Sequence, residues 1–206
     1  EDWPAGKKFR PHGIHVRKPR IFVVNHGVEQ GSSLEVFEGV DNGTLVGAKW
    51  LRSVEHPFIS GHGLPNSVVA VASDEVCVTT WRYWPLPVRG VARASLVERL
   101  QLSLQFAASV LRLPVTRVYR CVFNDEATSC SPVGARHAMA NGIALRGNMI
   151  YVVDVLRFAV TVYERRRDGS LVVNDTISLP HAADNVYALP DGSLLLGSMP
   201  KLHQCL

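Results

Sequence analysis

The sequence predicts an all-β protein built from repeated units of about four antiparallel strands. Three observations support this prediction: one apolar pattern recurs along the chain, two of its copies are followed by a second strand–turn–strand pattern, and only one segment has the features of a helix. Of the 206 residues, 47% are hydrophobic and 19% are charged. This composition is typical of a globular protein with a buried core, and it excludes disordered, collagen-like and coiled-coil chains.

The repeat consists of a polar residue that opens a short apolar strand, a tight turn and a second apolar strand. Its copies begin at His12, Asn66, Asn141 and Asn185 and read HGIHV-RKPR-IFVVNH, NSVVAV-ASDE-VCVTT, NGIAL-RGN-MIYVVD and NVYAL-PDGS-LLLGS. After the first and third copies comes a further hairpin, LEVFEGVDNGTLVGAKW and FAVTVYERRRDGSLVV, in which DNG and DG mark the turns. Four-stranded units that recur at about 40–75 residues with almost no helix between them predict the blades of a β-propeller.

The second copy contains the one expected helix, from about 96 to 111, between its second and third strands. Ser95 and Glu98 have the spacing of a capping box, and Pro114 follows the end of the segment. Apolar residues lie on more than one face of this helix. Two arrangements are therefore open: a lid packed on the top of the propeller, or a peripheral contact with a membrane or lipid particle.

The repeats account for about three and a half blades, because the last copy stops after two strands. A closed propeller has about four to eight blades. We therefore expect residues 1–206 to form one partial propeller domain, a fragment of a longer protein, and we expect this fragment alone to be inactive.

Charge and short motifs exclude several functional classes. The net charge of +4 is spread along the chain apart from the ERRRD run, so it does not indicate a nucleic-acid partner. GxSxG, HExxH, Walker and GxGxxG motifs are absent from the sequence, which argues against serine hydrolases, zincins and nucleotide-binding proteins. Asn42 and Asn174 begin NGT and NDT sequons, which favour a secreted or membrane-associated glycoprotein.

The four cysteines fit neither a CxxC metal pattern nor a dense disulfide framework. Cys121 and Cys130 are placed so that they can face each other across a hairpin. We expect them to be buried free thiols, with this pairing as the alternative.

Equivalent residues at the strand starts converge near the axis of a propeller. Here these residues are His12, Asn66, Asn141 and Asn185, with Asp184 beside the last. Amide and carboxylate oxygens are the ligands that Ca²⁺ prefers, and a lone histidine without thiolates argues against zinc. The alternative is that each asparagine is a turn residue bonded to its own backbone.

Several motifs of this chain resemble those of the serum paraoxonase and arylesterase family, which are calcium-dependent six-bladed propellers. In order they are PHGI, IFVVNH, LEVFE, PNSVVAV, ANGI with the following YVVD and VYE, and DNV with the following LG, and they extend over roughly residues 11–200. The resemblance implies a hydrolase of lactones and aryl esters, with a catalytic and a structural Ca²⁺.

The resemblance also assigns roles to individual residues. It implies Asn66, Asn141, Asp184 and Asn185 as ligands of the catalytic calcium and the carbonyl of Ile14 as a ligand of the structural one. It implies His12 and His26 as the pair that activates water, with His12 closer to the reaction.

The chain departs from the family in three places. Ser67 stands where members carry an aspartate of the structural calcium site, and Met199 stands where many carry a histidine of the pocket. The glutamate–aspartate pair that reaches both metals lies upstream of anything in this sequence. Fewer and less charged oxygens predict a lower calcium affinity.

Two other functions remain open. One is a non-catalytic β-propeller that serves as a binding module. The other is a propeller similar to sugar lactonases and strictosidine synthases, with other metals or substrates. The enzyme hypothesis implies a small lactone or ester as substrate and no nucleic-acid partner.

Overall fold

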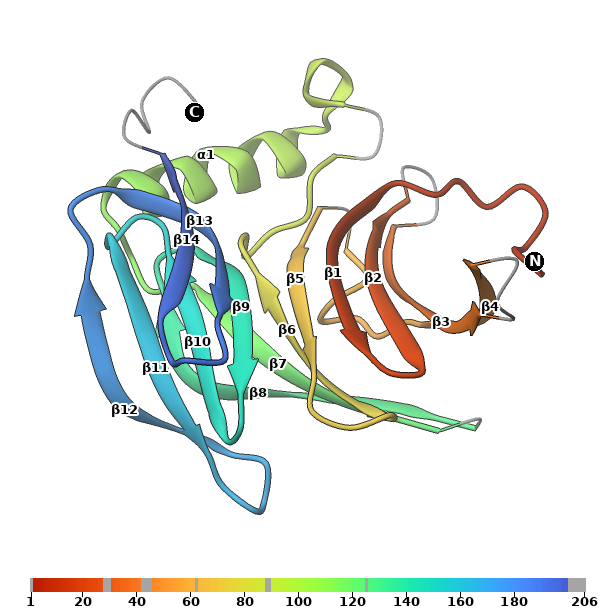
Figure 1. The fold of residues 1–206 in the computed structure, drawn as a ribbon. Helices are drawn as coiled ribbons and strands as arrows, with labels where there is room; N and C mark the ends of the chain where they lie inside the picture. Colours follow the sequence, from red (N-terminus) through yellow and green to blue (C-terminus); the bar gives the residue numbers. More distant parts are fainter. Residues whose placement is uncertain are drawn as a thin grey trace.

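The protein folds as an open arc of β-propeller blades, as predicted (Figure 1). The computed structural model describes residues 2–27, 31–41, 46–61, 63–87, 90–124 and 126–199. The sequon at Asn42 lies outside these residues, whereas Asn174 lies exposed on an outer strand.

Three sheets are four-stranded antiparallel meanders, here called blades 1 to 3, and a two-stranded sheet forms the half-blade. Blade 1 comprises β1 (Pro11–Arg17), β2 (Arg20–His26), β3 (Ser32–Asp41) and β4 (Val46–Val54). Blade 2 comprises β5 (Pro65–Ala70), β6 (Glu75–Thr80), β7 (Thr116–Phe123) and β8 (Thr128–His137). Blade 3 comprises β9 (Ala140–Arg146), β10 (Met149–Asp154), β11 (Ala159–Arg165) and β12 (Leu171–Ser178), and the half-blade comprises β13 (Ala182–Ala188) and β14 (Leu194–Met199).

Each blade packs one face against the next, so the apolar core is divided among the interfaces between blades. Side chains alternate along a strand, and in β3 Leu34 and Val36 therefore point toward blade 2. The first strands contact each other in succession, β1 with β5, β5 with β9 and β9 with β13. This contact brings the four strand starts of the repeat to a common axis.

The other face of blade 1 is covered by the N-terminal segment. Trp3 stacks on Phe37, and Lys7 Nζ lies 2.7 Å from the Oε1 of buried Glu35. Burial alone would raise the pKa of Glu35, but hydrogen bonds from Lys7 and from neighbouring hydroxyl and indole groups outweigh it and hold this pKa below its usual value. The segment therefore satisfies a carboxylate that blade 1 buries on this face.

The expected helix is confirmed as α1 (Leu96–Val110), and a short 3₁₀ helix, η1 (Val91–Arg93), precedes it. The capping box is present: Glu98 N donates to Ser95 Oγ over 3.3 Å, and Ser95 N donates to Glu98 Oε2 over 2.7 Å. In the part of the chain that the structure describes, no helix is long and apolar enough to cross a membrane.

Helix α1 lies above the blades (Figure 1), and most of its large apolar side chains are exposed. Its buried residues are Gln105 and Ala108, and Gln105 Oε1 accepts a hydrogen bond from Tyr83 N. Leu96 and Phe106 are 85% and 72% exposed. The helix thus buries Gln105 and Ala108, whereas its large apolar side chains are left mostly exposed.

The expectation of free thiols at Cys121 and Cys130 is wrong. These residues are directly opposite each other in β7 and β8, with Cα atoms 4.1 Å apart, and their sulfurs form a disulfide. Cys77 is a buried free thiol, and burial raises its pKa to about 12.

Candidate functional site

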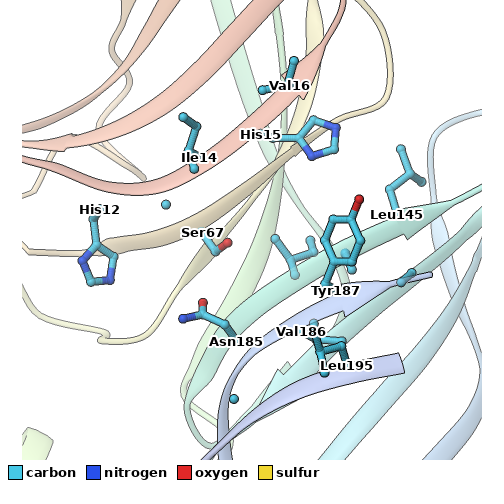
Figure 2. A pocket seen from close by; sticks show the side chains of 15 residues that line it. His12, Ile14, His15, Val16, Ser67, Leu145, Asn185, Val186, Tyr187 and Leu195 are labelled. Carbon is cyan, nitrogen blue, oxygen red and sulfur yellow. The ribbon is translucent and has the colours of Figure 1, made fainter. Parts of the chain in front are cut away.

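A cavity of about 650 Å³, open to solvent, lies between the first strands of the four sheets (Figure 2). This volume lies in the range of small-molecule sites, roughly 300–1,000 Å³. His12 and Asn185 line the cavity, whereas Asn66, Asn141 and Asp184 do not belong to its lining. Its polar lining comes from His12, His15, Ser67 and Asn185. The rest of the lining is largely apolar and includes Ile14, Val16, Leu145, Val186, Tyr187 and Leu195.

A β-bulge marks the same point of every first strand. The register with the second strand shifts at His12–Gly13, Asn66–Ser67, Asn141–Gly142 and Asp184–Asn185, where two residues oppose one. A bulge bends its strand and re-aims a side chain, and bulges are frequent beside functional sites. The bulges of β1, β5 and β13 contribute His12, Ser67 and Asn185 to the lining of the cavity.

Glycines allow the blades to approach closely at these bulges. A Cβ on Gly13 would lie 2.6 Å from the carbonyl oxygen of Asn66, and one on Gly142 would lie 2.6 Å from the Cα of Asn185. Real Cβ atoms do not come this near to backbone, so both positions require glycine. The sequence analysis missed this role, although HG and NG at one repeat position were a usable signal.

The two histidines assigned from the resemblance lie together at this end of blade 1. The ring centroids of His12 and His26 are 5.0 Å apart. His12 is exposed and lines the cavity, whereas His26 is half-buried and its Nδ1 lies 3.1 Å from Ser32 Oγ. Asn66 Nδ2 lies 3.1 Å from His12 Nε2, an arrangement in which the amide donates to an unprotonated Nε2.

The assigned metal ligands differ in their surroundings. Asn66 and Asn141 are 4% and 6% exposed, Asp184 is half-buried, and Asn185 is exposed and lines the cavity. Asn141 Oδ1 is buried and lacks a hydrogen-bond partner. A buried carbonyl oxygen left without a donor is unfavourable, and a bound cation would satisfy it.

The residues assigned as metal ligands are all oxygen donors, and only one of them is a carboxylate. Among the described residues, no group of three or more histidine, cysteine, aspartate or glutamate side chains is placed to hold a metal. A cation at this end of the strands therefore depends on amide and backbone oxygens, with Asp184 as the carboxylate, and such neutral oxygen donors suit a hard cation.

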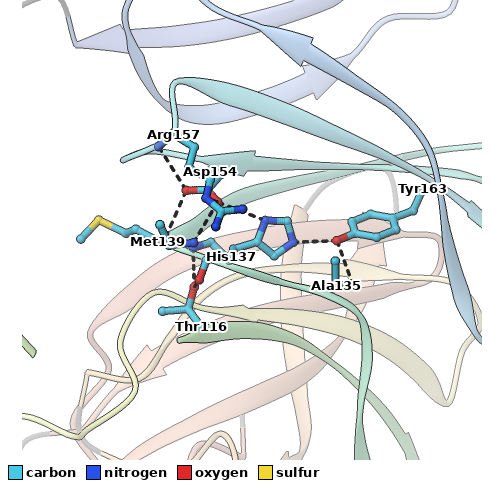
Figure 3. Close-up of polar contacts among 9 residues, drawn as sticks. Thr116, Ala135, His137, Met139, Asp154, Arg157 and Tyr163 are labelled. Atoms are coloured by element: carbon cyan, nitrogen blue, oxygen red, sulfur yellow. Dashed lines mark hydrogen bonds and ion pairs between the residues drawn. The ribbon is translucent and has the colours of Figure 1, made fainter. Parts of the chain in front are cut away.

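A buried polar cluster fixes the chain just before Asn141 (Figure 3). The carboxylate of Asp154 accepts hydrogen bonds from Ala138 N over 2.9 Å and Met139 N over 3.2 Å. Next along the chain, Ala140 N donates to Thr116 Oγ1 over 2.9 Å. Three successive N–H groups are thus held by side chains, which fixes the backbone that enters the bulge.

Two further residues of the cavity lining were not predicted from the sequence. His15 and Tyr187 line it, from β1 and β13. Burial, with a smaller contribution from Arg17, holds the pKa of His15 below its usual value. Met199, at the position where the resemblance implies a pocket histidine, packs against the apolar cluster between blade 3 and the half-blade.

No protein-family model and no curated protein matches this sequence. Solved structures similar to it include a catalytically inactive virginiamycin B lyase from Staphylococcus aureus with quinupristin (12% identity, TM-score 0.46, 95% of this chain and 51% of that one). A luciferin-regenerating enzyme is 14% identical, with a TM-score of 0.48 over 95% of this chain and 71% of that one. The calcium-binding protein regucalcin from Agrobacterium tumefaciens is 11% identical, with a TM-score of 0.43 over 92% of this chain and 68% of that one. The chain therefore spans about half the length of the lyase.

Proposed function

We propose that this protein is a calcium-dependent hydrolase of lactones and aryl esters that acts in the cavity between the first strands of its blades. One observation carries the proposal: equivalent bulges occur in all four sheets, three of them contribute His12, Ser67 and Asn185 to one cavity, and the bulge of β9 holds Asn141, whose side-chain oxygen is buried without a partner. The largely apolar lining suits an uncharged ester.

The metal would be held by the side-chain oxygens of Asn66, Asn141, Asp184 and Asn185. Bound there, Ca²⁺ supplies Lewis-acid stabilisation of the negative charge that develops on the carbonyl oxygen. With a single carboxylate in this set, its affinity is expected to be modest. Ser67 offers a hydroxyl in place of a second carboxylate, so the proposal includes no structural calcium.

His12 is the proposed general base. The hydrogen bond from the Asn66 amide favours the tautomer in which Nε2 carries no proton. The ring is exposed, so the attacking water can reach Nε2, and it must displace the Asn66 amide there before it gives up its proton. His26 packs beside His12 and is held by Ser32. We assign it the role of orienting the His12 ring.

The test is hydrolysis of phenyl acetate and of an aliphatic lactone by the protein expressed from the complete transcript. Chelation is expected to abolish turnover, and added Ca²⁺ to restore it. His12→Gln should lower kcat by about 10²–10⁴-fold and remove the acidic limb of the pH–rate profile, because the base is lost. His181→Gln is the matched control, since His181 is exposed and outside the cavity lining.

Turnover that survives chelation would contradict the role of calcium. Absence of turnover at every calcium concentration would instead favour the non-catalytic binding module.

We also propose that helix α1 contacts a lipid surface. Its outward face carries large apolar side chains that nothing in the described chain covers: Leu96, Val97, Leu100, Leu104, Phe106 and Val110. The polar residue Gln105 faces the blades instead, so the helix is amphipathic with its apolar side toward solvent. This orientation is typical of a helix that lies in a membrane interface.

Co-sedimentation with vesicles, made of phosphatidylcholine with or without phosphatidylserine, tests this contact. Phe106→Asp is expected to reduce the bound fraction at least about ten-fold, since a charge would enter the apolar layer. Val172→Asp, which adds a charge to an exposed valine of β12, should bind as the original protein does. Equal binding of both variants to the vesicles would contradict the proposal.

A further inference from the structure

In each sheet one residue of the second strand lies opposite the bulge of the first strand. In blade 2 this residue is of a different kind from those in the other sheets. In the second strands, the residue opposite each bulge is Val24 in blade 1, Val153 in blade 3 and Gly197 in the half-blade. In blade 2 it is Thr79, which is completely buried. The hydroxyl of Thr79 is therefore the one polar group at this repeat position.

The backbones of blades 2 and 3 also meet differently from those of the other neighbouring blades. Gly13 and Gly142 let blade 1 touch blade 2 and blade 3 touch the half-blade. At the corresponding position blade 2 has Ser67, whose Cβ excludes the same backbone contact. Another link must therefore hold the two blades at this point.

Thr79 makes that link with one hydroxyl group. Ser67 N donates to Thr79 Oγ1 over 3.1 Å, and Thr79 Oγ1 donates to the carbonyl oxygen of Asn141 over 2.5 Å. The first bond fixes the peptide that follows Asn66, and the second fixes the peptide plane of Asn141 itself. One side chain thus holds the backbone of both buried asparagines.

We propose that Thr79 is a positioning residue that sets the relative placement of the Asn66 and Asn141 side chains and thereby the calcium affinity of the site. The inference rests on the proposed function, because it assumes that these side-chain oxygens bind Ca²⁺. Both amides are almost fully buried, so their backbone placement determines where their oxygens lie.

The variant Thr79→Val removes the hydroxyl and keeps the shape. Valine already occupies the equivalent position in blades 1 and 3, so the blade tolerates it there. We expect the calcium affinity, measured by titration calorimetry with Ca²⁺ alone, to fall about 10–100-fold, which is usual when a residue that orients a metal ligand is lost. Thr79→Ser keeps the hydroxyl and should remain within about three-fold of the original affinity.

Thr80→Val is the matched control. Thr80 is the next residue and is also buried, but its hydroxyl donates to Arg117 O, within blade 2 and away from the asparagines. The midpoint of thermal unfolding in chelator should fall in both variants, and further in Thr79→Val because its hydroxyl makes two hydrogen bonds and that of Thr80 makes one. Only Thr79→Val should weaken calcium binding. This contrast separates positioning of the ligands from a general loss of stability.

The outcomes are distinct. Unchanged affinity in Thr79→Val, or an equal loss in Thr80→Val, would overturn the inference while the original protein still binds Ca²⁺. Failure of the original protein to bind Ca²⁺ would overturn the proposed function together with the inference. Loss in Thr79→Val with rescue by Thr79→Ser supports both.

Discussion

Replacing Asn141 with alanine is expected to lower calcium affinity about 100-fold or more, equivalent to about 2.7 kcal/mol, and to leave the calcium-free protein nearly as stable as before. Asn141 Oδ1 is buried without a hydrogen-bond partner, so its removal costs no hydrogen bond in the absence of metal. The small cavity left by the substitution lowers stability, and the removal of an unsatisfied oxygen raises it. The net change in the free energy of unfolding should therefore stay within about 1 kcal/mol.

Thermal unfolding with calcium and with chelator tests both the lower calcium affinity and the nearly unchanged stability of the calcium-free protein. Calcium that binds the folded state raises the midpoint of unfolding, and the rise should vanish in Asn141→Ala. Asn148→Ala makes the same substitution at the other end of the β9–β10 hairpin, where the side chain is exposed, and should retain the full rise. A variant that keeps the calcium-dependent rise would show that Asn141 is not a ligand.

The common position of the candidate residues in their sheets was predictable, because it depends on the phase of the repeat. His12, Asn66, Asn141 and Asn185 each lie at the bulge of a first strand in successive sheets. Which of them line the cavity was not predictable, since only His12 and Asn185 do. Helix α1 was predictable for a local reason, since Ser95 and Glu98 satisfy its first N–H groups from within four residues.

The features that the sequence did not predict depend on which residues lie opposite each other in neighbouring strands. Cys121 and Cys130 form a disulfide because they are directly opposite each other in β7 and β8, and their flanking sequence alone does not distinguish a disulfide from buried thiols. Thr79 resembles any threonine of a strand until its bulge partner is known. The outward orientation of the apolar face of α1 was likewise not predictable, because periodicity does not tell which side of a helix packs against the rest of the protein.

The largest loss of stability is expected from Asp154→Ala, about 3–5 kcal/mol. Asp154 is 1% exposed, and its carboxylate accepts hydrogen bonds from the backbone N–H groups of Ala138, Met139 and Arg157 and lies 3.5 Å from His137 Nδ1 (Figure 3). Alanine would leave these buried donors without an acceptor, and each buried donor without a partner destabilises the folded state. Asp168→Ala, in the exposed β11–β12 turn of the same blade, should change the denaturation midpoint little.

The same carboxylate predicts how stability depends on pH. Burial alone would raise the pKa of Asp154, but hydrogen bonds from His137 and from the N–H groups of Ala138 and Met139 outweigh burial and lower it. Between the folded and unfolded pKa values the unfolded chain binds more protons, so stability rises with pH there. The contribution of Asp154 is therefore complete above the unfolded value of about 3.9 and is lost as the pH falls through the lowered folded value.

Urea denaturation at a series of pH values from neutral to acid measures this contribution as the difference between the original protein and Asp154→Asn. The difference should be largest near neutral pH and shrink in acid, because asparagine has no proton to gain. Parallel curves would mean that the Asp154 carboxylate has the same pKa in both states. Because Ala138 and Met139 lead directly into the bulge at Asn141, loss of the carboxylate should also weaken calcium binding, and acid should weaken it in the original protein for the same reason.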